Sequence, residues 1–230
     1  MTRVFLRLIF AILILLASAV AQAGLQEGID AYGKGDYPVA LKEFKPLAAK
    51  GNASAQSALG YMYANGQGVP QDYKKAVVWY LKAAKQGEVE AQTFLGALYA
   101  NGQGVPQDYK KAAMWYRKAA EQGVADAQSN LGVMYANGQG MHQDDQEAVS
   151  WYRKAAEQGN APAQFNLGVM YSNGQGVPQD LVQAYHWFIL AETAVGEDAA
   201  NNKKLIEVDM TPQQIEEAQK LANEWKEKHK

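Results

Sequence analysis

The chain has 230 residues, of which 48% are hydrophobic and 20% charged, with 22 basic against 24 acidic side chains. These proportions are ordinary for a folded globular protein and exclude collagen-like and disordered chains. The net charge of −2 lacks the basic excess of nucleic-acid-binding proteins, so we expect no nucleic-acid partner. Because there is no cysteine, a thiol nucleophile, a disulfide framework and a cysteine-ligated metal site are excluded too.

The first 23 residues have the three parts of a secretory signal peptide. Arg3 and Arg7 are their only charges, residues 8–17 are all apolar, and small residues follow and end in Ala21-Gln22-Ala23. A membrane anchor is the alternative, but a spanning helix needs about 20 apolar residues and would have to include these small residues as well. We expect cleavage after Ala23, no stable membrane anchor, and a bacterial periplasmic or secreted protein.

A repeat with a step of 36 residues dominates the rest of the chain. The string NGQGVPQD begins at Asn65, Asn101 and Asn173, and the variant NGQGMHQD begins at Asn137. The same step relates a tryptophan column and a tyrosine column, which comprise Trp79, Trp115, Trp151 and Trp187, and Tyr63, Tyr99, Tyr135 and Tyr171.

Each repeat is predicted to form two helices. Ala55, Leu59 and Tyr63 are spaced four residues apart and form one helical stripe, which the Asn-Gly-Gln-Gly turn then ends. Asp72 is placed to cap a second helix, whose apolar stripe includes Tyr80. Because such a pair cannot bury its stripe alone, stacking of the copies predicts an all-α fold, a right-handed α-solenoid with a concave and a convex face.

The period also gives the domain organisation. Asp36-Tyr37 repeats the start of the second helix, and Thr211-Pro212-Gln213-Gln214 has the pattern of a capping box before an amphipathic, half-polar helix. The predicted segments are a signal peptide (1–23), a degenerate tetratricopeptide-like first helical pair (24–51), four repeats (52–87, 88–123, 124–159 and 160–195) and a C-terminal capping region (196–230).

The repeated pattern is A-x-x-x-L-G-x-x-Y, then NGxGVxxD, then A-x-x-W-Y-x-x-A-A-x-x-G. It resembles the Sel-like repeat, a branch of the tetratricopeptide-repeat superfamily, strongly over residues 52–195 and weakly over 25–51. The resemblance implies a curved helical scaffold that serves as an adaptor for protein complexes, and exported bacterial members are linked to envelope processes and to contact with host proteins. Some cysteine-rich relatives bind or hydrolyse penicillin-like compounds, but this chain lacks their paired cysteines.

Catalytic motifs are missing from the sequence. There is no S-x-x-K, no G-x-S-x-G and no G-x-x-x-x-G-K-[ST], so serine acyl chemistry and a phosphate cradle lack their usual frames. His142 lies near Asp144 and Asp145, which leaves either a metal contact or, the reading we favour, a solvated loop. We attribute the tryptophan column to packing between repeats rather than to ligand stacking, and we expect no cofactor, no metal and no enzymatic activity.

Alignment with tetratricopeptide helices places residues at −5, −2, +2 and +6 from the leucine of each Leu-Gly pair on the concave face. The asparagine at +6 recurs in every copy, so we assign it to ending the helix. Acidic residues then occupy the middle of the face and aromatic residues its ends, with no lysine or arginine to clamp a chain terminus. The candidate partner-binding residues are Ser54, Ser57, Tyr61, Glu90, Thr93, Asp126, Ser129 and Phe165.

The sequence therefore predicts an exported, monomeric, non-enzymatic scaffold that binds a polypeptide of unknown identity on its concave face. One alternative is an envelope enzyme or small-ligand binder that acts on peptidoglycan or β-lactam-like compounds. Another is self-assembly through the exposed ends of the solenoid.

Overall fold

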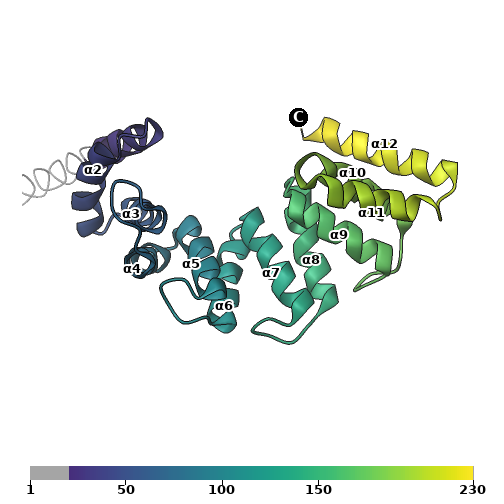
Figure 1. Cartoon of the computed structure of the whole chain (residues 1–230), viewed down its shortest axis with the longest axis horizontal. Helices are drawn as coiled ribbons and strands as arrows, with labels where there is room; N and C mark the ends of the chain where they lie inside the picture. Colours follow the sequence, from purple (N-terminus) through teal and green to yellow (C-terminus); the bar gives the residue numbers. More distant parts are fainter. Residues whose placement is uncertain (1–20, 230) are drawn as a thin grey trace, which may run out of the picture. The chain divides into compact units, whose positions relative to one another are not determined.

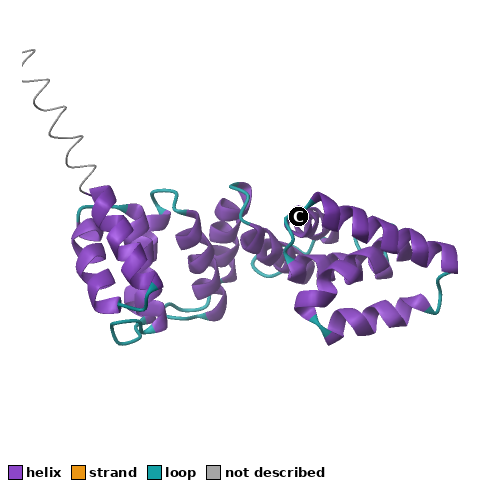
Figure 2. Cartoon of the chain, turned by 90° about the horizontal axis from the view of Figure 1, so that it is seen from above, coloured by secondary structure: helices purple, strands orange, loops and turns teal. Residues whose placement is uncertain are grey.

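The computed structural model describes residues 21–229. Residues 1–20 of the predicted signal peptide lie outside this range. All regular elements in this range are helices, joined by short loops (Figure 2). Residues 21–33 are helical and are followed by α2 (Tyr37–Ala49), α3 (Ala53–Asn65), α4 (Tyr73–Ala84), α5 (Val89–Asn101), α6 (Tyr109–Glu121), α7 (Ala125–Asn137), α8 (Asp145–Glu157), α9 (Ala161–Asn173), α10 (Leu181–Val195), α11 (Glu197–Glu207) and α12 (Pro212–Lys228), labelled in Figure 1. The predicted all-α architecture of helix-turn-helix repeats is confirmed.

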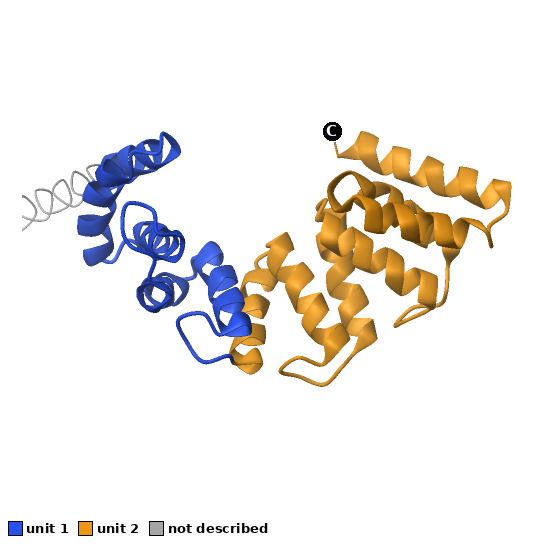
Figure 3. Ribbon diagram, viewed as in Figure 1, with its two compact units in different colours: residues 1–107 blue, residues 108–230 orange. Residues whose placement is uncertain are grey.

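The chain divides into two compact units, residues 1–107 and residues 108–230, which are described separately (Figure 3). We call them unit 1 and unit 2. In both units, consecutive helices pack against each other in antiparallel pairs such as α3 with α4 and α7 with α8.

The local signals that end and begin the helices act as predicted. Helix α3 ends at Asn65, and Gly66 follows with φ 69°, a left-handed conformation that glycine adopts without strain. Helix α4 begins after Asp72, whose Oδ1 accepts a hydrogen bond of 3.0 Å from the backbone N–H of Lys75. The same aspartate cap recurs at Asp108, Asp144 and Asp180.

The second glycine of each Asn-Gly-Gln-Gly turn lies against the second helix of the preceding repeat. In unit 2, a Cβ on Gly140 would lie 2.4 Å from the backbone carbonyl carbon of Tyr109, at the start of α6. In unit 1, Gly104 approaches Tyr73 at the start of α4 in the same way. The turn therefore ends one helix and also fixes its repeat against the previous one.

In the first, third and fourth repeats, the glycine of the Leu-Gly pair packs on an aromatic ring. A Cβ on Gly60 would lie 2.7 Å from the ring of Tyr80, and Gly168 faces Phe188 at the same distance. The predicted stripe of the second helix is buried, because Ala76 and Tyr80 both have zero exposure. In the tryptophan column, Trp115 and Trp187 are buried at 6% exposure, whereas Trp79 is half-buried with Lys82 4.2 Å from its ring centroid.

Buried glutamines link neighbouring repeats, a feature that the sequence analysis did not predict. Gln128, which is 5% exposed, donates to the carbonyl of Ala120 at 3.0 Å. Its Oε1 accepts a bond of 2.8 Å from Nε2 of Gln158, at the end of α8 in the same repeat. In unit 1, Gln56 bonds in the same way with Ala48 and Gln86. Both ends of each buried carboxamide are thus paired.

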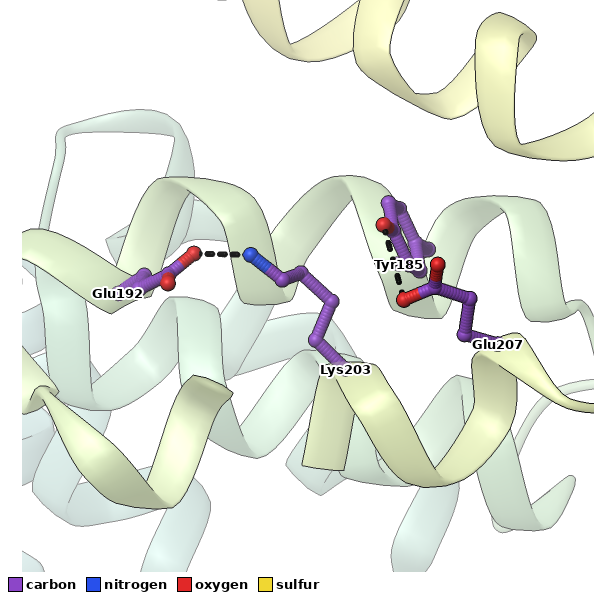
Figure 4. A network of polar contacts seen from close by, with 4 residues as sticks. All are labelled: Tyr185, Glu192, Lys203 and Glu207. Carbon is purple, nitrogen blue, oxygen red and sulfur yellow. Dashed lines mark hydrogen bonds and ion pairs between the residues drawn. The ribbon is translucent and has the colours of Figure 1, made fainter. Parts of the chain in front are cut away.

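The C-terminal region contains two helices where the sequence predicted one. The predicted capping box at Thr211 and Gln214 is present and starts α12, which buries Ala218 and Ala222. Helix α11 was missed because its residues are mostly polar. It is joined to α10 by an ion pair between Lys203 and Glu192 and by a 3.4 Å hydrogen bond from Tyr185 to Glu207, contacts that Figure 4 shows side by side.

The hydroxyl of Tyr80 is buried and makes no hydrogen bond, and burial raises its pKa above the usual value. The equivalent positions in the second, third and fourth repeats are Tyr116, Tyr152 and Phe188. The core therefore accepts a phenyl ring at this position. We expect Tyr80→Phe to raise the free energy of unfolding by about 1 kcal/mol, because an unpaired buried hydroxyl is removed without a cavity. Urea unfolding followed by circular dichroism tests this, and a loss of stability would show that the hydroxyl has a partner.

Candidate functional site

An open pocket of about 370 Å³ lies in unit 1. Its walls come from four parts of the unit, namely the helix of residues 21–33 and helices α2, α3 and α5. The lining is apolar except for a serine, a glutamate and two tyrosine hydroxyls, and it comprises Ile29, Tyr32, Phe44, Ser57, Ala58, Tyr61, Glu90 and Phe94.

Aromatic rings form a continuous row along this pocket. The centroids of Tyr32 and Tyr61 are 6.1 Å apart and those of Tyr61 and Phe94 are 5.5 Å apart, both edge to face. Phe94 also stacks on the buried ring of Tyr80 at 5.2 Å. Tyr61 and Phe94 are each 36% exposed, and Ile29 is 49% exposed. A gathering of exposed apolar side chains around a pocket is typical of a binding surface.

Two carboxylates lie at one side of the pocket. Glu90 lines it, and Glu88 precedes α5 and accepts a hydrogen bond of 3.4 Å from the hydroxyl of Ser54. Burial, and then the neighbouring carboxyl of Glu90, raise the pKa of Glu88 above its usual value. The two acidic groups therefore interact directly, and the edge of the pocket carries negative charge.

In unit 1, the structure brings three of the predicted site residues, Ser57, Tyr61 and Glu90, around the pocket. Ser54 lies beside them through its bond to Glu88, whereas the hydroxyl of Thr93 is bonded to the backbone carbonyl of Val89.

The other three predicted site residues lie in unit 2 and make internal contacts. Asp126 accepts a 2.8 Å hydrogen bond from Asn160, and Ser129 is only 6% exposed. Phe165 is half-buried against Phe188, with ring centroids 5.8 Å apart. The two sets of candidates thus belong to different units, and only members of the first set line the pocket.

The sequence analysis missed most of the apolar lining, namely Ile29, Tyr32, Phe44, Ala58 and Phe94. One signal was present for Phe94, because the repeat step relates it to Ala58, Asn130 and Asn166, so it is the single aromatic residue in its column. The register taken from tetratricopeptide helices excluded this column. Ile29 and Tyr32 had no such signal, since the first helical pair departs from the repeat.

Other features of the described residues give no metal centre. No group of three or more histidine or acidic residues lies close enough to hold a metal ion within residues 21–229. Over the same range, every helix is too short or too polar to cross a bilayer. His186 in α10 is 6% exposed and its Nδ1 has no hydrogen-bond partner, and burial lowers its pKa to about 4.

The Sel1 repeat family model matches residues 53–88, 89–124, 125–160 and 161–193, which together cover more than half of the chain. The chain belongs to the Sel1 repeat family. The family resemblance inferred from the repeated pattern is thereby confirmed. Sel1 repeat proteins are generally scaffolds for protein–protein interaction rather than enzymes.

Two solved structures of Sel1 repeat proteins are similar to this one. The Sel1 repeat protein from Oxalobacter formigenes is 32% identical, with a TM-score of 0.76, over 87% of this chain and 82% of that one. The protein c5321, described as a protective antigen of uropathogenic Escherichia coli with an SLR fold, is 33% identical, with a TM-score of 0.61, over 91% of this chain. This chain spans about half (54%) of the E. coli protein. No curated protein sequence matches significantly.

Proposed function

We propose that this Sel1 repeat protein is an exported, non-catalytic adaptor that binds a polypeptide, and that the pocket of unit 1 is its main contact. The observation that carries the proposal is the row of exposed aromatic rings, since Tyr61 and Phe94 are each 36% exposed beside a largely apolar pocket. Aromatic side chains gathered in one place dominate the energetics of many protein interfaces.

Export is proposed from the signal-like residues 1–23. The description of the E. coli relative as a protective antigen agrees with it, because an antigen that protects has to be accessible to antibodies. We propose a periplasmic or secreted monomer after cleavage at Ala23.

The repeat provides substitutions that test the pocket without disturbing the fold. Valine and asparagine stand at the positions of Tyr61 and Phe94 in the third and fourth repeats, as Val133, Val169, Asn130 and Asn166. We expect the double variant Tyr61→Val, Phe94→Asn to retain at least tenfold less polypeptide from a native envelope extract than the wild type does, with unchanged helicity. Such a loss corresponds to about 1.4 kcal/mol or more of binding free energy.

Val78→Ser is the matched control, because Val78 is 52% exposed in the same unit and Ser150 occupies its position in the third repeat. It should retain polypeptides as the wild type does. Equal retention by the folded double variant would remove the pocket from the proposed function. The volume of 370 Å³ also suits a small ligand. Binding of murein fragments or β-lactams in place of polypeptides would therefore support the alternative function.

A further inference from the structure

The pocket of unit 1 combines apolar walls with an acidic side, and this combination restricts what can bind. Phe44, which is 1% exposed, lies on the inner side of the lining, while the exposed rings of Tyr61 and Phe94 stand at its opening. A polar side chain placed among these groups would lose its hydrogen bonds to water without replacement. The walls therefore favour an aliphatic or aromatic side chain.

The acidic side consists of Glu90, which lines the pocket, and of Glu88, whose pKa is raised by its burial and then by the neighbouring Glu90 carboxyl. The lining of the pocket contains no lysine or arginine. Among the described residues, no ion pair joins either glutamate to a basic side chain. Two carboxylates that face each other without a cation repel, and a cation supplied by a ligand would relieve this repulsion.

The pair is particular to this repeat. The repeat step relates Glu88 to Asn52, Val124 and Asn160, so an acidic residue stands at this position once. Helix capping does not require it, since Glu88 makes no side-chain cap to α5. The acidic pair therefore lies next to the pocket in this repeat alone.

We propose that the pocket selects a polypeptide segment in which an aromatic or branched aliphatic residue stands next to a lysine or arginine. The apolar side chain enters between Tyr61 and Phe94, and the neighbouring cation lies against Glu88 and Glu90. This inference rests on the proposed function and names the chemical class of its partner.

The test uses four fluorescein-labelled hexapeptides with blocked termini and the full mature protein. The reference peptide is Ser-Gly-Phe-Lys-Gly-Ser, and the others replace its lysine by serine, its lysine by glutamate, or its phenylalanine by serine. Fluorescence anisotropy in 20 mM salt should give at least tenfold tighter binding for the lysine peptide than for the glutamate peptide. The advantage should shrink in 500 mM salt, because salt screens partly exposed charges. The peptide without phenylalanine should bind at least tenfold more weakly than the reference.

Glu88→Gln combined with Glu90→Gln should reduce the preference for lysine over serine to less than twofold while leaving the serine peptide's affinity unchanged. Glu157→Gln, which removes an exposed charge in unit 2, is the matched control and should keep the preference. Equal affinity for the lysine and glutamate peptides would overturn the inference, and so would a preference that survives in the double glutamine variant. If both peptides bind equally and lose affinity in the Phe94→Asn variant, the inference fails while the proposed function stands. If no peptide binds at millimolar concentration, the inference fails as well.

Discussion

Replacing Gly140 by alanine is expected to lower the free energy of unfolding by about 3 kcal/mol. The residue has φ 75°, which costs an alanine about 1 kcal/mol, and its new methyl group would lie 2.4 Å from the carbonyl carbon of Tyr109. The atoms it meets belong to the backbone at the start of α6, so no side-chain rotation relieves the overlap. Urea unfolding followed by circular dichroism measures the effect.

Gly123→Ala separates the two contributions. Gly123 also has a positive φ, of 95°, but a Cβ there would meet nothing within 4 Å. This variant should lose only the backbone contribution of about 1 kcal/mol. Equal losses for Gly123→Ala and Gly140→Ala would show that the turn does not fix one repeat against the next.

Acidification is expected to destabilise the protein through His186. Burial lowers the pKa of this histidine from 6.5 to about 4 in the folded chain. Between these values the unfolded chain binds a proton that the folded chain does not, so the free energy of unfolding decreases as the pH falls. The loss from this residue should be negligible at pH 7.5 and reach about 2 kcal/mol at pH 4.5.

His186→Met isolates this contribution from that of the carboxylates. The repeat step relates His186 to Val78, Met114 and Ser150, so a side chain that does not titrate is accepted at this position in every other repeat. The difference in unfolding free energy between pH 7.5 and pH 4.5 should be smaller in the variant by about 2 kcal/mol. Urea titrations at both pH values measure it. If the two proteins lose equal stability, His186 is not responsible.

The fold was predictable where the sequence repeats itself. Asp72 and Gly66 mark helix ends through their own chemistry, and their recurrence every 36 residues confirms the assignment four times within one chain. Helix α11 was not predictable in this way, because it has no counterpart among the repeats and only Ala199 and Ile206 of it are buried. The buried glutamines were not predicted, because glutamine is mostly a surface residue and its burial here depends on how the helices pack.

The site was predictable only in part, for a related reason. Tyr61 and Glu90 were found because they differ from their equivalents at positions assigned to the concave face. Phe94 also differs from its equivalents, but it lies one residue before Leu95, outside that assignment. Its exposure depends on how α3 and α5 pack, which the periodicity of a single helix does not specify.

The glutamine pairs have a consequence for how the structure opens. Gln128 is held by the carbonyl of Ala120 in the repeat before it and by Gln158 at the end of its own repeat. If α8 alone detaches and takes Gln158 with it, the buried oxygen of Gln128 loses its partner, so detachment of both helices of the repeat together is favoured. Fraying from an end should therefore advance in whole repeats rather than residue by residue, and amide hydrogens of one helical pair should exchange together. A destabilising substitution in one repeat would then lower the stability of the adjacent repeat but not of repeats further away.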